Sequence, residues 1–118
     1  MDSEERTSEM KRTELFEAPL TAERGVVLVT VELLPGDAAP LHTHPGDEVL
    51  YVVEGTVVAE VEGQQPRPLR AGESFQFPRE TPHFARNVSD RPARVLASII
   101  HAAGQPNTVM VPAQPAVA

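Results

Sequence analysis

Short apolar runs separated by proline and glycine turns recur along this chain. The run GVVLVTVELL is rich in β-branched residues and closes on Pro35-Gly36, which is typical of a strand that meets a turn. The runs EVLYVVE and TVVAEV are joined tightly at Gly55 and predict two antiparallel strands. The run ESFQFP alternates polar and aromatic residues and stops at Pro78, as a half-buried strand does. Strands are predicted at residues 25–34, 48–54, 56–62, 73–78, 83–89 and 93–102.

No segment shows a convincing helical period, so we expect an all-β sandwich or barrel of about seven to nine short strands. Residues 13–18 form either a turn or an edge strand, and residues 109–111 either trail loosely or pair with a sheet edge or a second subunit. The polar residues 1–12 predict a disordered tail. We expect one domain over residues 13–112 and a C-terminal tail over 113–118.

Composition narrows the classes of function. The apolar share of 41% and the charged share of 23% are those of a soluble globular protein. The formal charge of −7 and the lack of a basic stripe argue against a nucleic-acid partner. No run approaches the ~20 apolar residues of a membrane span, and no apolar signal region precedes the first strand, so we expect a cytoplasmic protein. The absence of cysteine excludes disulfides and thiolate chemistry.

The stretch LHTHPGDE carries the first candidate chemistry. His42 and His44 are two residues apart, so in an extended segment both imidazoles point to one face. Glu48 follows the Pro45-Gly46 turn, from where it can supply a carboxylate oxygen. Two histidines and a carboxylate form a metal-binding set with open positions. A surface turn with two solvated histidines has the same pattern, so this stretch alone leaves both interpretations open.

A second stretch, GESFQFPRETPHFARN, closely resembles the second signature motif of the cupin family, and the first stretch resembles the first. The fixed positions of the first motif are filled by Gly36, His42, His44, Glu48 and Gly55. Those of the second are filled by Gly72, Pro78, His83 and Asn87. Glu80 stands where the family usually has glycine. Because glycine would ease a positive φ there, glutamate predicts a different turn geometry.

The resemblance implies the cupin jelly roll, also called the double-stranded β-helix, which is an antiparallel barrel. It also implies that His42, His44, Glu48 and His83 bind one divalent transition metal ion inside the barrel. These ligand types are compatible with Mn, Fe, Ni, Cu or Zn and do not choose among them. Four protein ligands leave two positions of an octahedral ion open for a small-molecule substrate.

Three further residues are candidates for the substrate pocket. Phe75 and Phe77 share a face of their strand, and we expect both to line the interior. Asn87 lies on the same face as His83, where a structural bond to the backbone competes with a pocket role. Glu48 is the candidate catalytic residue, because a loosely held carboxylate can accept a proton.

The resemblance to small, single-domain bacterial cupins implies a metal-dependent oxidoreductase of the dioxygenase type, acting on a small apolar molecule that bears oxygen. The alternatives are a non-catalytic module that binds a small ligand and a metal-dependent isomerase or lyase, since fold alone does not choose among them. We also expect a homodimer, formed through the uncharged C-terminal segment and the strand Val26–Leu34, because an exposed apolar edge needs cover.

Overall fold

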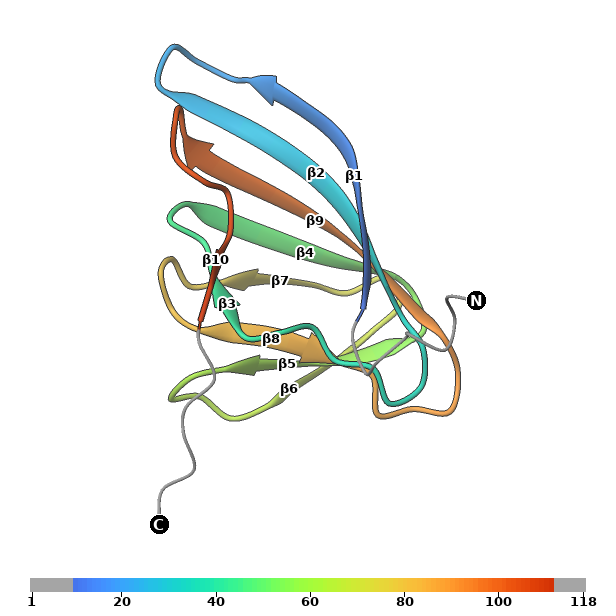
Figure 1. Cartoon of the computed structure of the whole chain (residues 1–118). Helices are drawn as coiled ribbons and strands as arrows, with labels where there is room; N and C mark the ends of the chain where they lie inside the picture. The colour runs from blue at the N-terminus through green and yellow to red at the C-terminus, as the bar shows by residue number, and fades with distance from the viewer. Residues whose placement is uncertain (1–9, 112–118) are drawn as a thin grey trace, which may run out of the picture.

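The computed structural model describes residues 10–111, and these form two five-stranded sheets that face each other (Figure 1). The all-β jelly roll expected from the sequence is confirmed. The strands are β1 (Lys11–Pro19), β2 (Arg24–Leu33), β3 (His42–Thr43), β4 (Asp47–Glu54), β5 (Thr56–Val61), β6 (Arg67–Arg70), β7 (Ser74–Phe77), β8 (His83–Arg86), β9 (Ala93–Ala102) and β10 (Val109–Met110). Within the described residues no helix is long and apolar enough to cross a membrane.

The first sheet has the strand order β1-β2-β9-β4-β7, and the second has the order β10-β3-β8-β5-β6. All pairs are antiparallel, and β2 and β9 pair without interruption over their full length. Alternate residues of these two strands are buried, because side chains of a strand point in turn to opposite faces. The inward residues, such as Val27 and Ile99, therefore build the core between the sheets.

The core lies in two clusters. The larger contains residues of both sheets, including Leu33, Val52 and Leu69, and the smaller joins β2 to β9. Leu50 and Phe77 belong to the larger cluster and also line an internal cavity. The cavity is therefore a direct continuation of the packed interior.

Several strand and tail boundaries differ from those expected from the sequence. Strand β1 begins at Lys11, so residues 13–18 form an edge strand, and the last two residues of the expected tail belong to the sheet. Strand β6 lies in the stretch GQQPRPLRAG, where the sequence pattern predicts no strand. Strand β10 pairs with β3 of its own chain. Residues 1–9 of the expected N-terminal tail and the expected C-terminal tail, 113–118, lie outside the described residues.

Candidate metal centre

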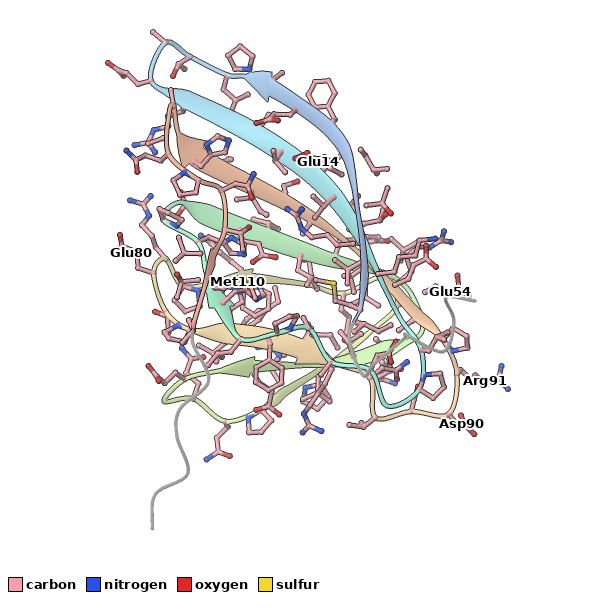
Figure 2. All side chains as sticks on the ribbon, in the orientation of Figure 1. Glu14, Glu54, Glu80, Asp90, Arg91 and Met110 are labelled. Atoms are coloured by element: carbon pink, nitrogen blue, oxygen red, sulfur yellow. The ribbon has the colours of Figure 1, made fainter. Side chains whose placement is uncertain are left out.

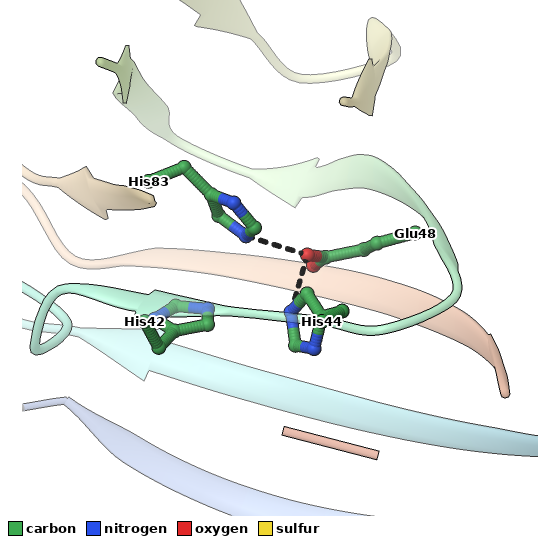
Figure 3. A group of neighbouring side chains, drawn as sticks. All are labelled: His42, His44, Glu48 and His83. Atoms are coloured by element: carbon green, nitrogen blue, oxygen red, sulfur yellow. Dashed lines mark hydrogen bonds and ion pairs between the residues drawn. The ribbon is translucent and has the colours of Figure 1, made fainter. Parts of the chain in front are cut away.

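The four predicted ligands converge at one point between the two sheets (Figure 3). One ligand atom from each of His42, His44, Glu48 and His83 lies within 4.8 Å of all the others. His42 on β3 pairs in register with His83 on β8, whereas Glu48 comes from β4 of the opposite sheet. The cluster therefore links the two sheets at the place where the sequence predicted a single site.

The turn between the histidines and Glu48 depends on a glycine. A side chain at Gly46 would place its Cβ 1.6 Å from the carbonyl oxygen of Ile100 on β9. Only glycine lets the backbone pass so close to β9. This close passage brings the chain from the second sheet into β4 of the first, so that Glu48 faces the histidines.

Backbone carbonyls orient all three imidazoles. The Nδ1 atoms lie 2.6 Å from the oxygen of Pro40 for His42, 2.7 Å from that of Asn107 for His44 and 2.8 Å from that of Thr81 for His83. A carbonyl oxygen only accepts, so each Nδ1 carries the proton and donates it. Each Nε2 is then left with a free lone pair, which is the tautomer that a metal ligand requires.

The Nε2 atoms of His44 and His83 lie 2.7 Å and 3.0 Å from Oε1 of Glu48. Burial opposes ionisation of Glu48, but the two imidazoles beside it, including a hydrogen bond from Nε2 of His83, outweigh burial and hold its pKa at about 2. An imidazole that already carries its Nδ1 proton can offer such a bond only by taking a second proton. A metal cation bound by the Nε2 atoms of His44 and His83 and by Oε1 of Glu48 would need no such proton.

Two further observations fit a metal ion. The Nε2 of His44 is buried and has no partner with hydrogen-bond geometry among the described residues, although Oε1 of Glu48 is close. Burial lowers the pKa of His42 to about 4, so this imidazole stays neutral at ordinary pH and keeps its lone pair. Three neutral imidazoles and an ionised carboxylate are a donor set for a divalent transition metal.

A cavity of about 270 Å³ adjoins the four ligands. Its remaining walls are mostly aliphatic, with Val29, Leu50 and Ile99 from the first sheet and Ala85 from the second. Four lining residues near the two ends of the described chain were not predicted from the sequence: Met10, Arg12, Thr108 and Met110. Met110 is labelled on β10 in Figure 2. No motif marks these residues, and the first two lie in the segment expected to be a tail.

Only one of the three expected pocket residues lines the cavity. Phe77 does, and its ring also stacks on the imidazole of His83, with 4.1 Å between the centroids. Phe75 shares its face but lies farther along β7, where it packs edge-on against Phe77 and beneath the guanidinium of Arg67. The pocket role expected for Phe75 is therefore not supported.

Asn87 is a structural residue. Its Nδ2 donates to the carbonyls of Leu33 and Arg91, at 2.9 Å and 2.7 Å, and its Oδ1 accepts from the backbone and hydroxyl of Ser89. All its hydrogen-bonding atoms are used in joining β2 to the turn before β9, and it does not line the cavity. The pocket role expected for Asn87 is therefore wrong, and the structural alternative holds.

The turn before His83 keeps the geometry that glycine would give. Glu80, labelled in Figure 2, has a φ of 59°, and its backbone nitrogen donates to the carbonyl of His44 at 3.0 Å. The different turn expected from glutamate is therefore wrong. Glutamate adopts the left-handed conformation, at a cost of about 1–2 kcal/mol, and the turn still reaches the metal centre.

The sequence profile of the cupin domain matches residues 29–99, which is more than half of the chain. This chain is a cupin. The matched region holds all four ligands, whereas Arg12 and Thr108 of the cavity lie outside it. The family assignment made from the two motifs is therefore confirmed.

Known proteins with related sequences and structures support the same family. The auxin-binding protein ABP19b of Prunus persica is 40% identical over 74 residues, which cover 58% of this cupin and 35% of that protein. An oxalate oxidase in complex with the substrate analogue glycolate superposes with a TM-score of 0.64 at 31% identity, over 73% of this cupin and 46% of that chain. The protein TT1209 of Thermus thermophilus gives a TM-score of 0.65 at 31% identity, over 91% of this cupin and 89% of that chain. This cupin thus spans about a third of the length of that curated relative from Prunus persica.

Proposed function

We propose that this cupin is a metal-dependent oxidoreductase of the dioxygenase type, acting on a small apolar molecule that bears an oxygen donor. The observation that carries the proposal is the convergence of three imidazole Nε2 atoms and one carboxylate on the wall of an apolar cavity. A divalent transition metal held by these four groups would supply redox chemistry and open coordination positions. These ligands do not determine which of the metals Mn, Fe, Ni, Cu and Zn is bound.

The side chains of the cavity have simple roles in this scheme. The aliphatic walls, such as Val29 and Ile99, exclude water and hold the apolar body of the substrate. Among the described lining residues, Glu48 is the only carboxylate. We therefore propose Glu48 as the group that accepts a proton from a bound substrate. Within the described lining there is no separate acid–base pair, which favours chemistry centred on a metal over chemistry carried by side chains alone.

The known relatives bear on two candidate functions. The resemblance to an oxalate oxidase supports an oxidase or oxygenase reaction. The relative named as an auxin-binding protein supports the second candidate, a module that binds a small apolar ligand without converting it. The apolar lining is compatible with both, so measured turnover has to separate them.

The test is metal content and oxygen uptake, measured on untagged wild type beside His44→Ala. The matched control is His101→Ala, which removes a buried histidine outside the cluster. We expect about one metal ion per chain in the wild type and the control and almost none in His44→Ala, because each lost ligand weakens the site. Oxygen uptake with a panel of small enols, catechols and diketones should be present in the two proteins that hold metal and absent from His44→Ala.

Each outcome decides between functions. Metal-dependent oxygen uptake supports the dioxygenase proposal. Saturable ligand binding without any turnover supports the binding module, and turnover under anaerobic conditions supports an isomerase or lyase. A wild-type protein that takes up no metal, even after soaking, contradicts both the dioxygenase and the metal-dependent isomerase or lyase.

A homodimer also belongs to this proposal. The outer face of the first sheet carries a group of apolar side chains, Leu28, Leu96, Val49 and Tyr51, beside polar neighbours such as Thr30 and Ser98. The area of this face is roughly 480 Å² per copy, from five strands spaced ~4.8 Å apart and about six residues per strand at ~3.3 Å each. This area is near the lower bound for a specific interface. A second copy offers the same apolar group for face-to-face packing of the two sheets. The expected cytoplasmic location and the absence of a nucleic-acid partner stay predictions.

A further inference from the structure

The cavity has one permanently charged cation in its described wall, Arg12 of β1. Arg12 pairs in register with Val31, whose side chain also lines the cavity, so both point to the inner face. In the described part of the chain no ion pair of Arg12 is present, although other arginines are paired. Those pairs are Arg79 with Asp47, Arg86 with Glu60 and Arg94 with Glu54. The Arg12 guanidinium is therefore a cation available to a ligand in the cavity.

Strand register places Arg12 far from the metal centre. Glu48 aligns with Ile99 and Val27 across the first sheet, whereas Arg12 aligns with Val31. Val27 and Val31 are four residues apart on β2, which is ~13 Å along the strand at ~3.3 Å per residue. The wall between the two rows is apolar and includes Val29 and Leu50. The cavity thus has a metal-binding end, an apolar middle and a cationic end.

We propose that the ligand of this cavity carries a metal-binding oxygen group at one end and an anionic group, such as a carboxylate, at the other, with an apolar segment between them. This inference rests on the proposed metal-centred function and adds the class of ligand. The volume of about 270 Å³ equals that of about nine water molecules at ~30 Å³ each, which limits the ligand to a small molecule. Arg12 selects the ligand by its charge and is not itself a catalytic residue.

The test uses probes with both ends defined. Straight-chain dicarboxylic monohydroxamates with four to six methylenes place a metal-binding hydroxamate at one end and a carboxylate at the other. Alkyl hydroxamates of equal length, ending in a methyl group, lack only the charge. Their affinities for metal-loaded protein are measured by calorimetry in the wild type, Arg12→Gln and Lys11→Gln. Lys11 is the matched control, because it lies on the opposite face of β1, where it aligns with Glu32 in the strand register.

We expect the carboxylate to tighten binding about three- to tenfold in the wild type and in Lys11→Gln, because it adds a charge-assisted hydrogen bond with the guanidinium of Arg12. In Arg12→Gln the two probe series should bind equally, and the methyl-ended probe shows that the rest of the cavity is intact. A carboxylate effect that persists in Arg12→Gln, or is absent from the wild type, overturns the role of Arg12 while the metal-centred function stands. Failure of every hydroxamate, the methyl-ended series included, overturns the metal-centred function and this inference together.

Discussion

The ring of Phe77 lies nearly parallel to the imidazole of His83, with 15° between their planes. His83 is thus held in two ways, by this stack and by the hydrogen bond from its Nδ1 to the carbonyl of Thr81. Both contacts fix the direction in which its Nε2 points toward Glu48. The orientation of a metal ligand here depends on a residue that also forms part of the core.

Replacing Phe77 with leucine should weaken metal binding about tenfold, because His83 loses the surface that holds its plane. The measurement is competition with a chelating dye at equilibrium. Phe75→Leu is the matched control, since Phe75 touches Phe77 and not the ligands. Equal affinities in the two variants would show that the stack does not position His83. Urea unfolding of both separates this effect from a general loss of stability.

The segment before β10 should matter for the metal as well. Nδ1 of His44 donates to the carbonyl of Asn107, and the hydroxyl of Thr108 lies 3.3 Å away. A chain that ends at Ala103 loses these partners, so we expect metal affinity to fall about 10- to 100-fold. A chain that ends at Val111 keeps them and serves as the control. Unchanged affinity in the shorter chain would contradict the role of this segment.

Acid should destabilise the metal-free protein. The pKa of His42 is lowered by burial from 6.5 to about 4, and that of Glu48, despite burial, from 4.5 to about 2. In both cases the unfolded chain binds its proton at a higher pH than the folded chain does. The free energy of unfolding therefore falls as the pH drops from 6.5 toward 2, by up to about 1.4 kcal/mol per pH unit for each group.

Urea unfolding of the metal-free protein at several values between pH 7 and pH 4.5 tests this. His42→Gln should flatten the upper part of the profile, because that part comes from His42. A profile that is already flat in the wild type would rule out the low pKa of this imidazole.

The left-handed conformation of Glu80 predicts an unusual order of stabilities. Glu80→Gly relieves strain but increases the freedom of the unfolded chain, so we expect a change within about 1 kcal/mol. Glu80→Val should be destabilising by about 1–2 kcal/mol, because a β-branched residue fits a positive φ poorly. Thermal unfolding compares the two. Equal stability of the glycine and valine variants would show that the turn relaxes to another geometry.

The proposed homodimer predicts a face-specific effect of charge. Val49→Lys puts a lysine into the apolar group on the outer face, and we expect it to convert dimer to monomer in sedimentation equilibrium. Val88→Lys is the control, since Val88 is exposed in the turn after β8. A wild type that is monomeric at tens of micromolar contradicts the dimer. Dissociation by both lysines would place the interface elsewhere.

The metal centre could be predicted from sequence because its ligands sit in short local patterns. The spacing of His42 and His44 puts both on one face, and the second motif supplies His83, which the structure places beside His42 on the neighbouring strand. The long strands β2 and β9 were equally visible, as apolar runs rich in β-branched residues and bounded by turns. Each of these features depends on neighbours within a few residues, which is the range over which a sequence pattern carries information.

The missed features depend on distant partners. Strand β6 contains Pro68, but it is an edge strand that needs few backbone donors, so the proline is tolerated there. Arg12 sits in a polar stretch and becomes part of a cavity only because β1 pairs with β2. The geometry at Glu80 was also hidden, because the surrounding contacts and not the residue type decide its φ.

Met10 and Met110 line the same cavity from positions a hundred residues apart in the chain. During synthesis the N-terminal wall is therefore made long before the C-terminal wall that completes the enclosure. A nascent chain that has already emerged through His83 possesses all four ligands but still lacks the carbonyl of Asn107 that orients His44. The cavity and the orientation of His44 are therefore completed only when residues 107–110 have joined the fold.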